Sequence, residues 1–134
     1  MGLMVDTNVF ISFEKSGQPF LMPAGYQDQI PYVSVITISE LLIGAHRANS
    51  EQRRQRRLDF IDLVLSGGFV VDFTLATARI HAEIHADLSV KGQLIGAHDL
   101  LIAATARYHN LSLLTDNVDE FSRVPGLQII SATK

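Results

Sequence analysis

The stretch Leu3-Met-Val-Asp-Thr-Asn8 sets the pattern for the rest of the chain. Its three apolar residues predict a short buried strand, and the three polar residues after them predict the end of that strand. The residues that follow resemble a helix start, for which Thr7 or Asn8 would be the N-cap. The same order returns near the other end of the chain, where the apolar run 111–114 stops at Thr115-Asp-Asn117. Buried strands of this kind are typical of a parallel sheet.

Working outward from this stretch, apolar runs and helical segments alternate along the chain. Further strands are predicted at 32–35, 69–73, 111–114 and 127–130. Further helices are predicted at 37–45, 51–65, 75–88 and 98–108. The segment 16–25, which is rich in glycine and proline, is predicted to be a loop. This alternation favours an α/β fold in which a parallel sheet is covered by helices on both faces.

Composition limits the classes of function. The chain has 134 residues, of which 47% are hydrophobic and 19% charged, so we expect one folded domain over residues 1–134. It contains no cysteine, which excludes disulfides, thiolate metal sites and cysteine nucleophiles. A net charge of −3 is not that of a protein that coats duplex DNA by bulk charge. Because no long apolar run and no basic signal region are seen, we expect a soluble, cytoplasmic protein without a membrane span.

Acidic residues stand where such a fold binds ligands. In open α/β sheets, ligands bind beyond the carboxyl ends of the strands. Asp6 ends the first strand, Glu40 lies in the first turn of the helix after the second strand, and Asp99 opens the helix that leads to the fourth. Asp116 and Asp119 flank the end of that fourth strand. Glu40 and Asp99 also have apolar neighbours one helical turn away, so both are expected to point into the protein.

Each of these acids also has a structural interpretation. Asp6 is of a type that caps helices, Thr37-x-x-Glu40 matches a capping box, and an acid such as Asp99 is favoured in a first helical turn. These interpretations weaken if the three acids converge, because carboxylates about 5 Å apart repel by about 3 kcal/mol per pair at an effective dielectric of 20. A divalent cation held by oxygen ligands, such as Mg²⁺, would relieve that repulsion.

Four ordered motifs carry a resemblance to a known family. They are Met4-Val-Asp-Thr-Asn8, Thr37-Ile-Ser-Glu-Leu-Leu-Ile-Gly-Ala45, His98-Asp-Leu-Leu-Ile-Ala-Ala-Thr-Ala106, and Leu114-Thr-Asp-Asn117 followed by Phe121 and Val124-Pro-Gly126. With these motifs at this spacing, the chain resembles PIN-domain ribonucleases, and most closely the VapC-type toxins of type II toxin–antitoxin modules. The resemblance covers the chain from end to end.

The resemblance implies a PIN-like three-layer α/β/α fold with a central, mostly parallel sheet. It implies an endoribonuclease that depends on Mg²⁺ or Mn²⁺ and hydrolyses phosphodiester bonds in RNA. It also implies a cognate antitoxin protein as partner and a homodimer. Asp6, Glu40 and Asp99 fall on the catalytic, metal-binding positions of the family. Asn117 stands where many members have a fourth acid, for which Asp116 or Asp119 is an alternative.

Short polar side chains accompany these acids. Thr7, Asn8, Thr115 and Asn117 are of a size and chemistry that orient water or phosphate. Each of them is equally suited to cap a helix or to form a turn.

Two other functions remain open. One is a catalytically silent PIN-fold module that binds RNA or protein, which the intact set Asp6, Glu40 and Asp99 argues against. The other is a phosphohydrolase of another doubly wound fold with Asp6 as nucleophile. The phosphatases in question have a second Asp two residues later, where this chain has Asn8.

Two further groups of residues have ambiguous roles. The basic residues of the third predicted helix form either a solvated face, a contact with RNA phosphates or an antitoxin-docking surface; they are Arg53, Arg54, Arg56 and Arg57. His81 and His85 have the i, i+4 spacing of zinc ligands, but no third ligand is evident and the order is not that of a metalloprotease motif. We therefore expect these histidines to be surface or packed residues.

Overall fold

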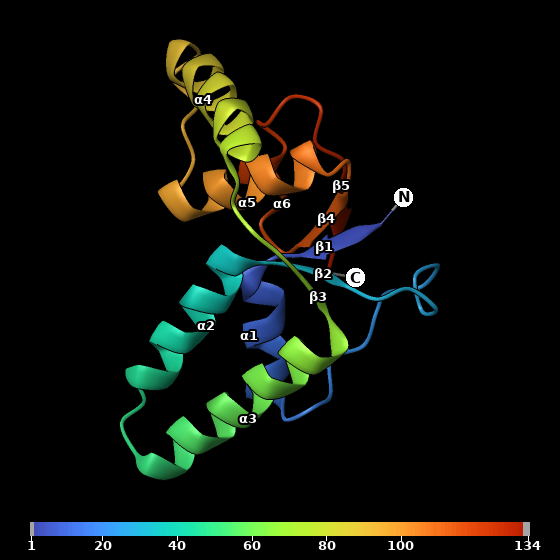
Figure 1. The fold of residues 1–134 in the computed structure, drawn as a ribbon, viewed down its shortest axis with the longest axis vertical. Coiled ribbons are helices and arrows are strands. Elements are labelled where there is room, and N and C mark those ends of the chain that lie inside the picture. The colour runs from blue at the N-terminus through green and yellow to red at the C-terminus, as the bar shows by residue number, and fades with distance from the viewer. Residues whose placement is uncertain (1, 133–134) are drawn as a thin grey trace.

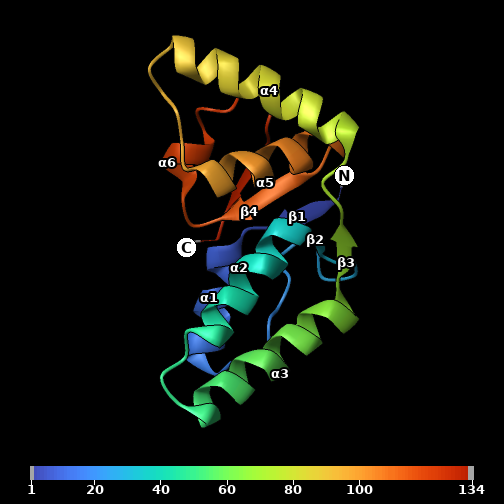
Figure 2. The same cartoon turned by 60° about the vertical axis from the view of Figure 1, so that its left-hand side comes forward.

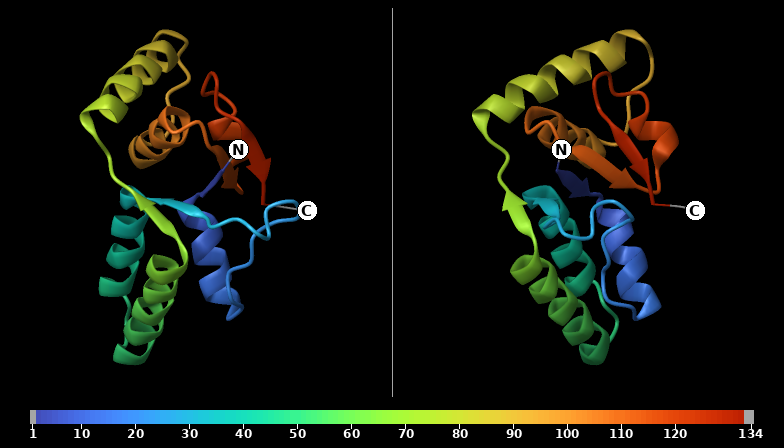
Figure 3. Two further views of the ribbon diagram at one scale, coloured as in Figure 1. Left: turned by 45° about the vertical axis from the view of Figure 1, so that its right-hand side comes forward. Right: turned by 90° about the vertical axis from the view of Figure 1, so that its right-hand side faces the viewer.

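Five short strands form one sheet in residues 2–132, the part of the chain that the computed structural model describes. They are β1 (Leu3–Val5), β2 (Tyr32–Ser34), β3 (Phe69–Val71), β4 (Ser112–Thr115) and β5 (Ile129–Ser131). Their order is β3-β2-β1-β4-β5, and all four neighbouring pairs are parallel. The two edges, β3 and β5, are seen on opposite sides of the sheet in Figure 3.

The helices cover the two faces of this sheet. They are α1 (Thr7–Ser16), α2 (Val35–His46), α3 (Glu51–Gly67), α4 (Leu75–Val90), α5 (Ala97–Tyr108) and the single turn α6 (Val118–Phe121), labelled in Figure 1. Figure 2 shows α4 and α5 on one side of the sheet and α1, α2 and α3 on the other. The three-layer α/β/α fold with a parallel sheet is therefore confirmed.

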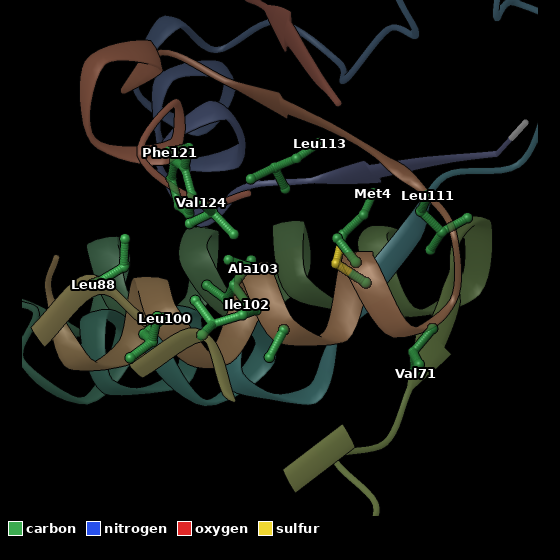
Figure 4. Close-up of a cluster of buried hydrophobic side chains, with 13 residues drawn as sticks. Met4, Val71, Leu88, Leu100, Ile102, Ala103, Leu111, Leu113, Phe121 and Val124 are labelled. Atoms are coloured by element: carbon green, nitrogen blue, oxygen red, sulfur yellow. The ribbon is translucent and has the colours of Figure 1, made fainter. Parts of the chain in front are cut away.

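Side chains of β1 divide the hydrophobic core in two. Met4 packs in the layer of α4 and α5, whereas Leu3 and Val5 pack in the layer of α1, α2 and α3. All three are completely buried, as expected for a central strand whose side chains alternate between two covered faces. Figure 4 shows Phe121, which follows β4, in the same cluster as Met4. Both faces of β1 are therefore fixed by packing, and a shift of one residue would exchange them.

The order of the strands determines where a ligand site forms. β2 lies on one side of β1 and β4 on the other, so the chain runs away from β1 in one direction and later returns to its other side. In open α/β sheets, ligands bind at the carboxyl ends of the two strands where this reversal occurs. Asp6 follows β1 directly, and Thr115 is the last residue of β4. These two residues therefore mark the expected position of the site.

The expected N-cap of α1 is wrong. The cap is Asp6, whose side chain accepts a hydrogen bond from the Thr7 backbone N–H, and the helix begins at Thr7. Asp, Thr and Asn are all good caps, so three of them in a row leave the first helical residue undetermined by local preference. The ladder with β4 removes this ambiguity, because the Asp6 N–H donates to the Leu114 carbonyl and so remains part of the strand.

The capping box expected at the start of α2 is also wrong. This helix begins at Val35, and its cap is Ser34, whose hydroxyl accepts a hydrogen bond from the Ile36 N–H at 3.1 Å. Thr37 is therefore the third residue of the helix, and Glu40 lies in its second turn, not its first. Glu40 is thus released from a capping role.

Two other differences from the expected elements bear on function. The turn α6 follows Asn117 in a segment for which no helix was predicted. A single helical turn is too short to show a hydrophobic period, so local sequence does not reveal it. Within residues 2–132, no helix has the length and apolar composition of a membrane span.

Candidate acidic site

Asp6 lies at the centre of the site. Its side chain is 2% exposed and accepts two hydrogen bonds of 2.8 Å, one from the Thr7 N–H to Oδ1 and one from the Thr115 hydroxyl to Oδ2. The Thr115 oxygen in turn accepts the Asn117 N–H at 2.9 Å. The buried carboxylate is thus held between the end of β1 and the end of β4.

Glu40 reaches the site from α2 through Thr7. The Thr7 hydroxyl lies 2.7 Å from Glu40 Oε1 and 3.0 Å from the hydroxyl oxygen of Thr37. The other carboxylate oxygen of Glu40 is 3.4 Å from Nδ1 of His98, which precedes Asp99. Glu40 therefore contacts Thr7, which is next to Asp6 in the chain, and His98, which is next to Asp99. These contacts bring the three predicted acids into one region.

Glu120 joins the site, although sequence reasoning did not select it. Its Oε2 accepts a hydrogen bond from the Asn117 side-chain amide at 3.0 Å, and its carboxyl group is hydrogen-bonded to that of Asp99. The contact with Glu120 favours the protonated form of Asp99 and so raises the pKa of Asp99. Glu120 stands on α6, and Phe121 next to it is completely buried and anchors that turn.

The pKa shifts report how closely the carboxyl groups are grouped. Burial is the main cause that raises the pKa of Asp6, with smaller contributions from the charges of Glu40 and Asp116, while its two hydrogen bonds oppose the rise. Burial also raises the pKa of Asp99 to about 7, and the charge of Asp6, the hydrogen bond to Glu120 and the charges of Glu120 and Glu40 add to it. Without a cation, Asp99 therefore tends to hold a proton near neutral pH.

The surroundings of Glu40 differ from expectation. The residues one turn after Asp99, Ile102 and Ala103, are completely buried, as expected for a face that points inward. Ile43, one turn after Glu40, is instead 42% exposed, and the side chain of Glu40 retains 28% of its exposure. Glu40 therefore stands at the rim of the site, and Asp6 at its base.

The remaining candidates lie at different distances from this network. Thr7, Thr115 and Asn117 belong to it through the hydrogen bonds described above. Asn8 is exposed on the first turn of α1, outside that set of bonds. Asp116 acts on Asp6 through its charge, whereas Asp119 is exposed and is not among the groups that shift either pKa.

The donor atoms of the site have the chemistry of a hard-cation site. They are carboxylate oxygens of Asp6, Glu40, Asp99 and Glu120, the kind of ligand that Mg²⁺ and Mn²⁺ prefer. In the described part of the chain, no three His, Asp or Glu side chains are already grouped so that they could hold a metal ion alone. Mg²⁺ commonly takes only one or two carboxylates and completes its shell with water and substrate phosphate. The residues present therefore fit such an ion.

The basic cluster of α3 makes contacts inside the protein. Arg57 donates a hydrogen bond to the Gly44 carbonyl at 2.7 Å, and its Nε is 3.7 Å from Glu14 Oε1. Arg53 donates to the Asn49 side chain, and Arg54 to Glu51. These contacts tie α3 to α1 and α2 and to its own first turn, which favours a partly structural role for the cluster.

A cavity lies between α1, α3 and the loop after α1. Its volume is about 650 Å³, and its walls are mainly apolar, with Phe10, Phe20, Met22, Phe60, Leu63 and Val64 among the lining residues. A second cavity of about 230 Å³ shares Glu14 and Phe60 with the first and is also lined by Glu40. The smaller cavity therefore lies between the apolar cavity and the rim of the acidic site.

Glu14 lies at the junction of these cavities with an unpartnered oxygen. Its side chain is only 10% exposed. Among residues 2–132, its buried Oε1 has no hydrogen-bond partner, since the nearby arginine nitrogens of Arg56 and Arg57 are 3.9 and 3.7 Å away. A buried carboxylate oxygen without a donor is costly, so this position favours a ligand that brings one.

The two histidines of α4 behave as packed surface residues. The rings of His81 and His85 are 6.3 Å apart, and His81 also meets Phe73 edge-on. Partial burial and the charge of His85 lower the pKa of His81. In the described residues neither histidine belongs to a set of metal ligands.

Comparisons with known proteins agree with this architecture. A family model described as the PIN domain matches residues 3–127. Ribonuclease VapC1 of Rickettsia felis is 39% identical over 133 residues, which cover 99% of this chain and 98% of that relative. The tRNA(fMet)-specific endonuclease VapC of Shigella flexneri is 32% identical, with 93% of each chain covered. The solved structure of VapBC-1 from nontypeable Haemophilus influenzae superposes with a TM-score of 0.83 at 28% identity and full coverage of both chains.

The family match includes every element of the acidic site, from the end of β1 to the turn α6. The relatives match over nearly their whole length, so the similarity extends beyond single motifs. This chain therefore belongs to the PIN domain family, as a VapC-type member.

Proposed function

We propose that this chain is a cation-dependent endoribonuclease and the toxin of a toxin–antitoxin pair. The observation that carries the proposal is the grouping of Asp6, Glu40, Asp99 and Glu120 at the carboxyl ends of β1 and β4 in a PIN-domain chain. The names of the relatives, ribonuclease and tRNA(fMet)-specific endonuclease, support RNA as the substrate and transfer RNA as a candidate class.

Asp6 and Asp99 are the carboxylates best placed to hold Mg²⁺ or Mn²⁺, with Glu40 and Glu120 beside them. When bound, the cation would supply positive charge for the phosphate oxygens in the transition state and would acidify a water molecule. Thr7 and Thr115 orient the carboxylates of Glu40 and Asp6. Asn117 holds Glu120 through its side-chain amide, so its neutral side chain supports an acid without adding charge.

The alternative in which Asp6 is a covalent nucleophile has little structural support. Both carboxylate oxygens of Asp6 already accept hydrogen bonds, and the side chain is 2% exposed. A nucleophile needs an oxygen that the bulky phosphate group can reach, whereas a small cation needs only the second lone pair that each Asp6 oxygen retains. A hydrolytic mechanism, in which the acids position a cation and water, is favoured instead.

The junction of the two cavities supports a protein partner with a mixed surface. The larger cavity would take apolar side chains, and Glu14 Oε1 would take a donor such as a lysine or arginine of the partner. We therefore place the cognate antitoxin at this face, next to the rim residue Glu40.

Two further expectations belong to this proposal. The family resemblance implies a homodimer, and the exposed apolar residues Leu75 and Val90 of α4, 72% and 89% exposed, are surface of the kind that a second copy covers. The cytoplasm is the compartment expected for an enzyme that acts on cellular RNA.

Cleavage should require a divalent cation. Protein stripped of metal should not cleave total RNA in EDTA, and added Mg²⁺ or Mn²⁺ should restore cleavage. Asp6→Asn should lower the cleavage rate by about 100-fold or more at saturating cation, because it removes the central charged ligand. Undiminished cleavage by metal-free protein would contradict the mechanism, and a folded wild-type protein that never cleaves RNA would favour the silent binding module.

Two neighbouring acids provide a matched test of the fourth ligand. Glu120→Gln and Asp119→Asn each remove one negative charge from α6, but only Glu120 interacts with Asp99. We expect Glu120→Gln to weaken Mn²⁺ binding by about tenfold or more in calorimetric titration. Asp119→Asn should leave the affinity nearly unchanged. Equal effects of the two substitutions would mean that only the net charge of α6 matters.

The metal-free protein should lose stability as the pH rises through about 7. The pKa of Asp99 is raised from 3.8 to about 7, so its contribution is fully present below 3.8 and lost above the folded-state value. Asp99→Asn should therefore stabilise the metal-free protein at pH 8, on the order of 1 kcal/mol because the partly exposed group is screened by solvent. Urea unfolding of both proteins at pH 5.5 and 8 measures this, and a wild-type pH dependence equal to that of Asp99→Asn would refute it.

Glu14 should contribute to binding of the antitoxin but not to cleavage. With the purified cognate antitoxin as titrant, Glu14→Gln should weaken binding by about tenfold, because a buried charged hydrogen bond is lost. Glu83→Gln, the same change at an exposed position on α4, is the control. An unchanged dissociation constant for Glu14→Gln would move the partner away from this face.

A further inference from the structure

Thr37 is a completely buried hydroxyl residue beside the acidic site. It is the third residue of α2, one turn before Glu40, so both side chains lie on the same side of the helix. Its hydroxyl oxygen is 3.0 Å from that of Thr7, the residue whose hydroxyl contacts Glu40 at 2.7 Å. Thr37, Thr7 and Glu40 thus form a chain of three oxygen atoms from the interior to the rim of the site.

The number of available protons determines which group donates in each of these two hydrogen bonds. A hydroxyl has one proton and two lone pairs, whereas an ionised carboxylate only accepts. The single proton of Thr7 goes to Glu40, because the bond to the charged acceptor is the shorter and the stronger one. The geometry of the 3.0 Å contact by itself favours Thr7 as donor, but once the single Thr7 proton lies on Glu40, only the Thr37 proton can complete that contact. The Thr37 hydroxyl therefore orients the Thr7 proton toward the carboxylate.

Glu40 needs such a restraint. It stands at the rim of the site, where its side chain keeps 28% of its exposure, and it faces the like charges of Asp6 and Asp99. Repulsion from these groups favours conformations in which Glu40 turns toward solvent. Thr7 is fixed by the Asp6 cap and by burial, so its bond to Oε1 opposes this movement, beside the longer contact of Oε2 with His98 Nδ1 at 3.4 Å.

We propose that Thr37 is a positioning residue that acts through Thr7 to hold Glu40 in the acidic site. This inference rests on the proposed function, because its consequence is a better ligand set for a divalent cation. Thr37 itself touches neither the cation nor the RNA. Its effect is that of an outer hydrogen-bond partner, and such partners commonly change metal affinity by 10–100-fold.

The test compares Mn²⁺ binding of the metal-free protein in wild-type, Thr37→Val and Thr37→Ser forms. Valine keeps the shape and removes the hydroxyl, so Thr37→Val should weaken Mn²⁺ binding by about tenfold in calorimetric titration. Serine keeps the hydroxyl, so Thr37→Ser should retain most of the affinity. In RNA cleavage at saturating substrate, Thr37→Val should require more Mn²⁺ for half-maximal rate while the KM for RNA stays nearly constant.

A second pair of threonine hydroxyls supplies the control. Thr77 is also completely buried and lies 3.1 Å from the Thr74 hydroxyl, at the start of α4. Thr77→Val removes one member of that pair and should not change Mn²⁺ affinity. Equal weakening by Thr77→Val and Thr37→Val would overturn the proposal, since general loss of stability would then explain both.

A double-mutant cycle tests the route through Glu40. If Thr37 acts only through Glu40, Thr37→Val should have almost no further effect on Mn²⁺ affinity in a Glu40→Gln background. The same weakening in both backgrounds, or an unchanged affinity of Thr37→Val alone, would overturn the proposal. If Thr37→Val does not fold, Thr37→Cys, whose thiol is a weak donor, takes its place with the same expected result. A wild-type protein that binds no Mn²⁺ would instead contradict the proposed function.

Discussion

The buried carboxylate of Asp6 is the constraint on which the rest of the structure depends. It caps α1, accepts the Thr115 hydroxyl from the end of β4, and carries the charge around which the other acids are grouped. Burial of a charge is costly unless hydrogen bonds compensate for it. The Thr115 donor is present only because β4 lies directly beside β1 in the sheet, with Leu114 opposite Val5. Asp6 therefore contributes to the fold and to the acidic site through the same hydrogen bonds.

Much of the fold could be predicted from the sequence, because its signals are local. Short strands of three or four residues are separated by one or two helices, and apart from the turn α6 these helices have ten or more residues, long enough to show their period in the sequence. Asp6, Glu40 and Asp99 could be selected because they follow strands or open helices. The caps of α1 and α2 could not be chosen, since neighbouring residues had similar capping preferences and the choice was made by the sheet.

Contacts between distant segments determine the site features that local sequence could not show. Glu120 belongs to the site because Phe121 is buried and holds a single helical turn against the core. The contact of Thr7 with Thr37 joins residues on two helices, and only this contact gives Thr37 a role beyond packing. Glu14 has an ordinary position on α1, and its importance comes from α3, whose arginines approach it without forming a hydrogen bond.

The strand order has a consequence for the way in which the protein is made. β1 is synthesised first, yet its neighbour β4 is among the last elements, and the bond between Thr115 and Asp6 joins residues 109 positions apart. A nascent chain that has emerged only as far as α4 contains Asp6 and Glu40 but neither Asp99 nor Glu120. The acids gather only after α5, β4 and α6 have all been made. A ribosome that synthesises this nuclease is thus not exposed to a working copy of it until the segment through α6 has emerged.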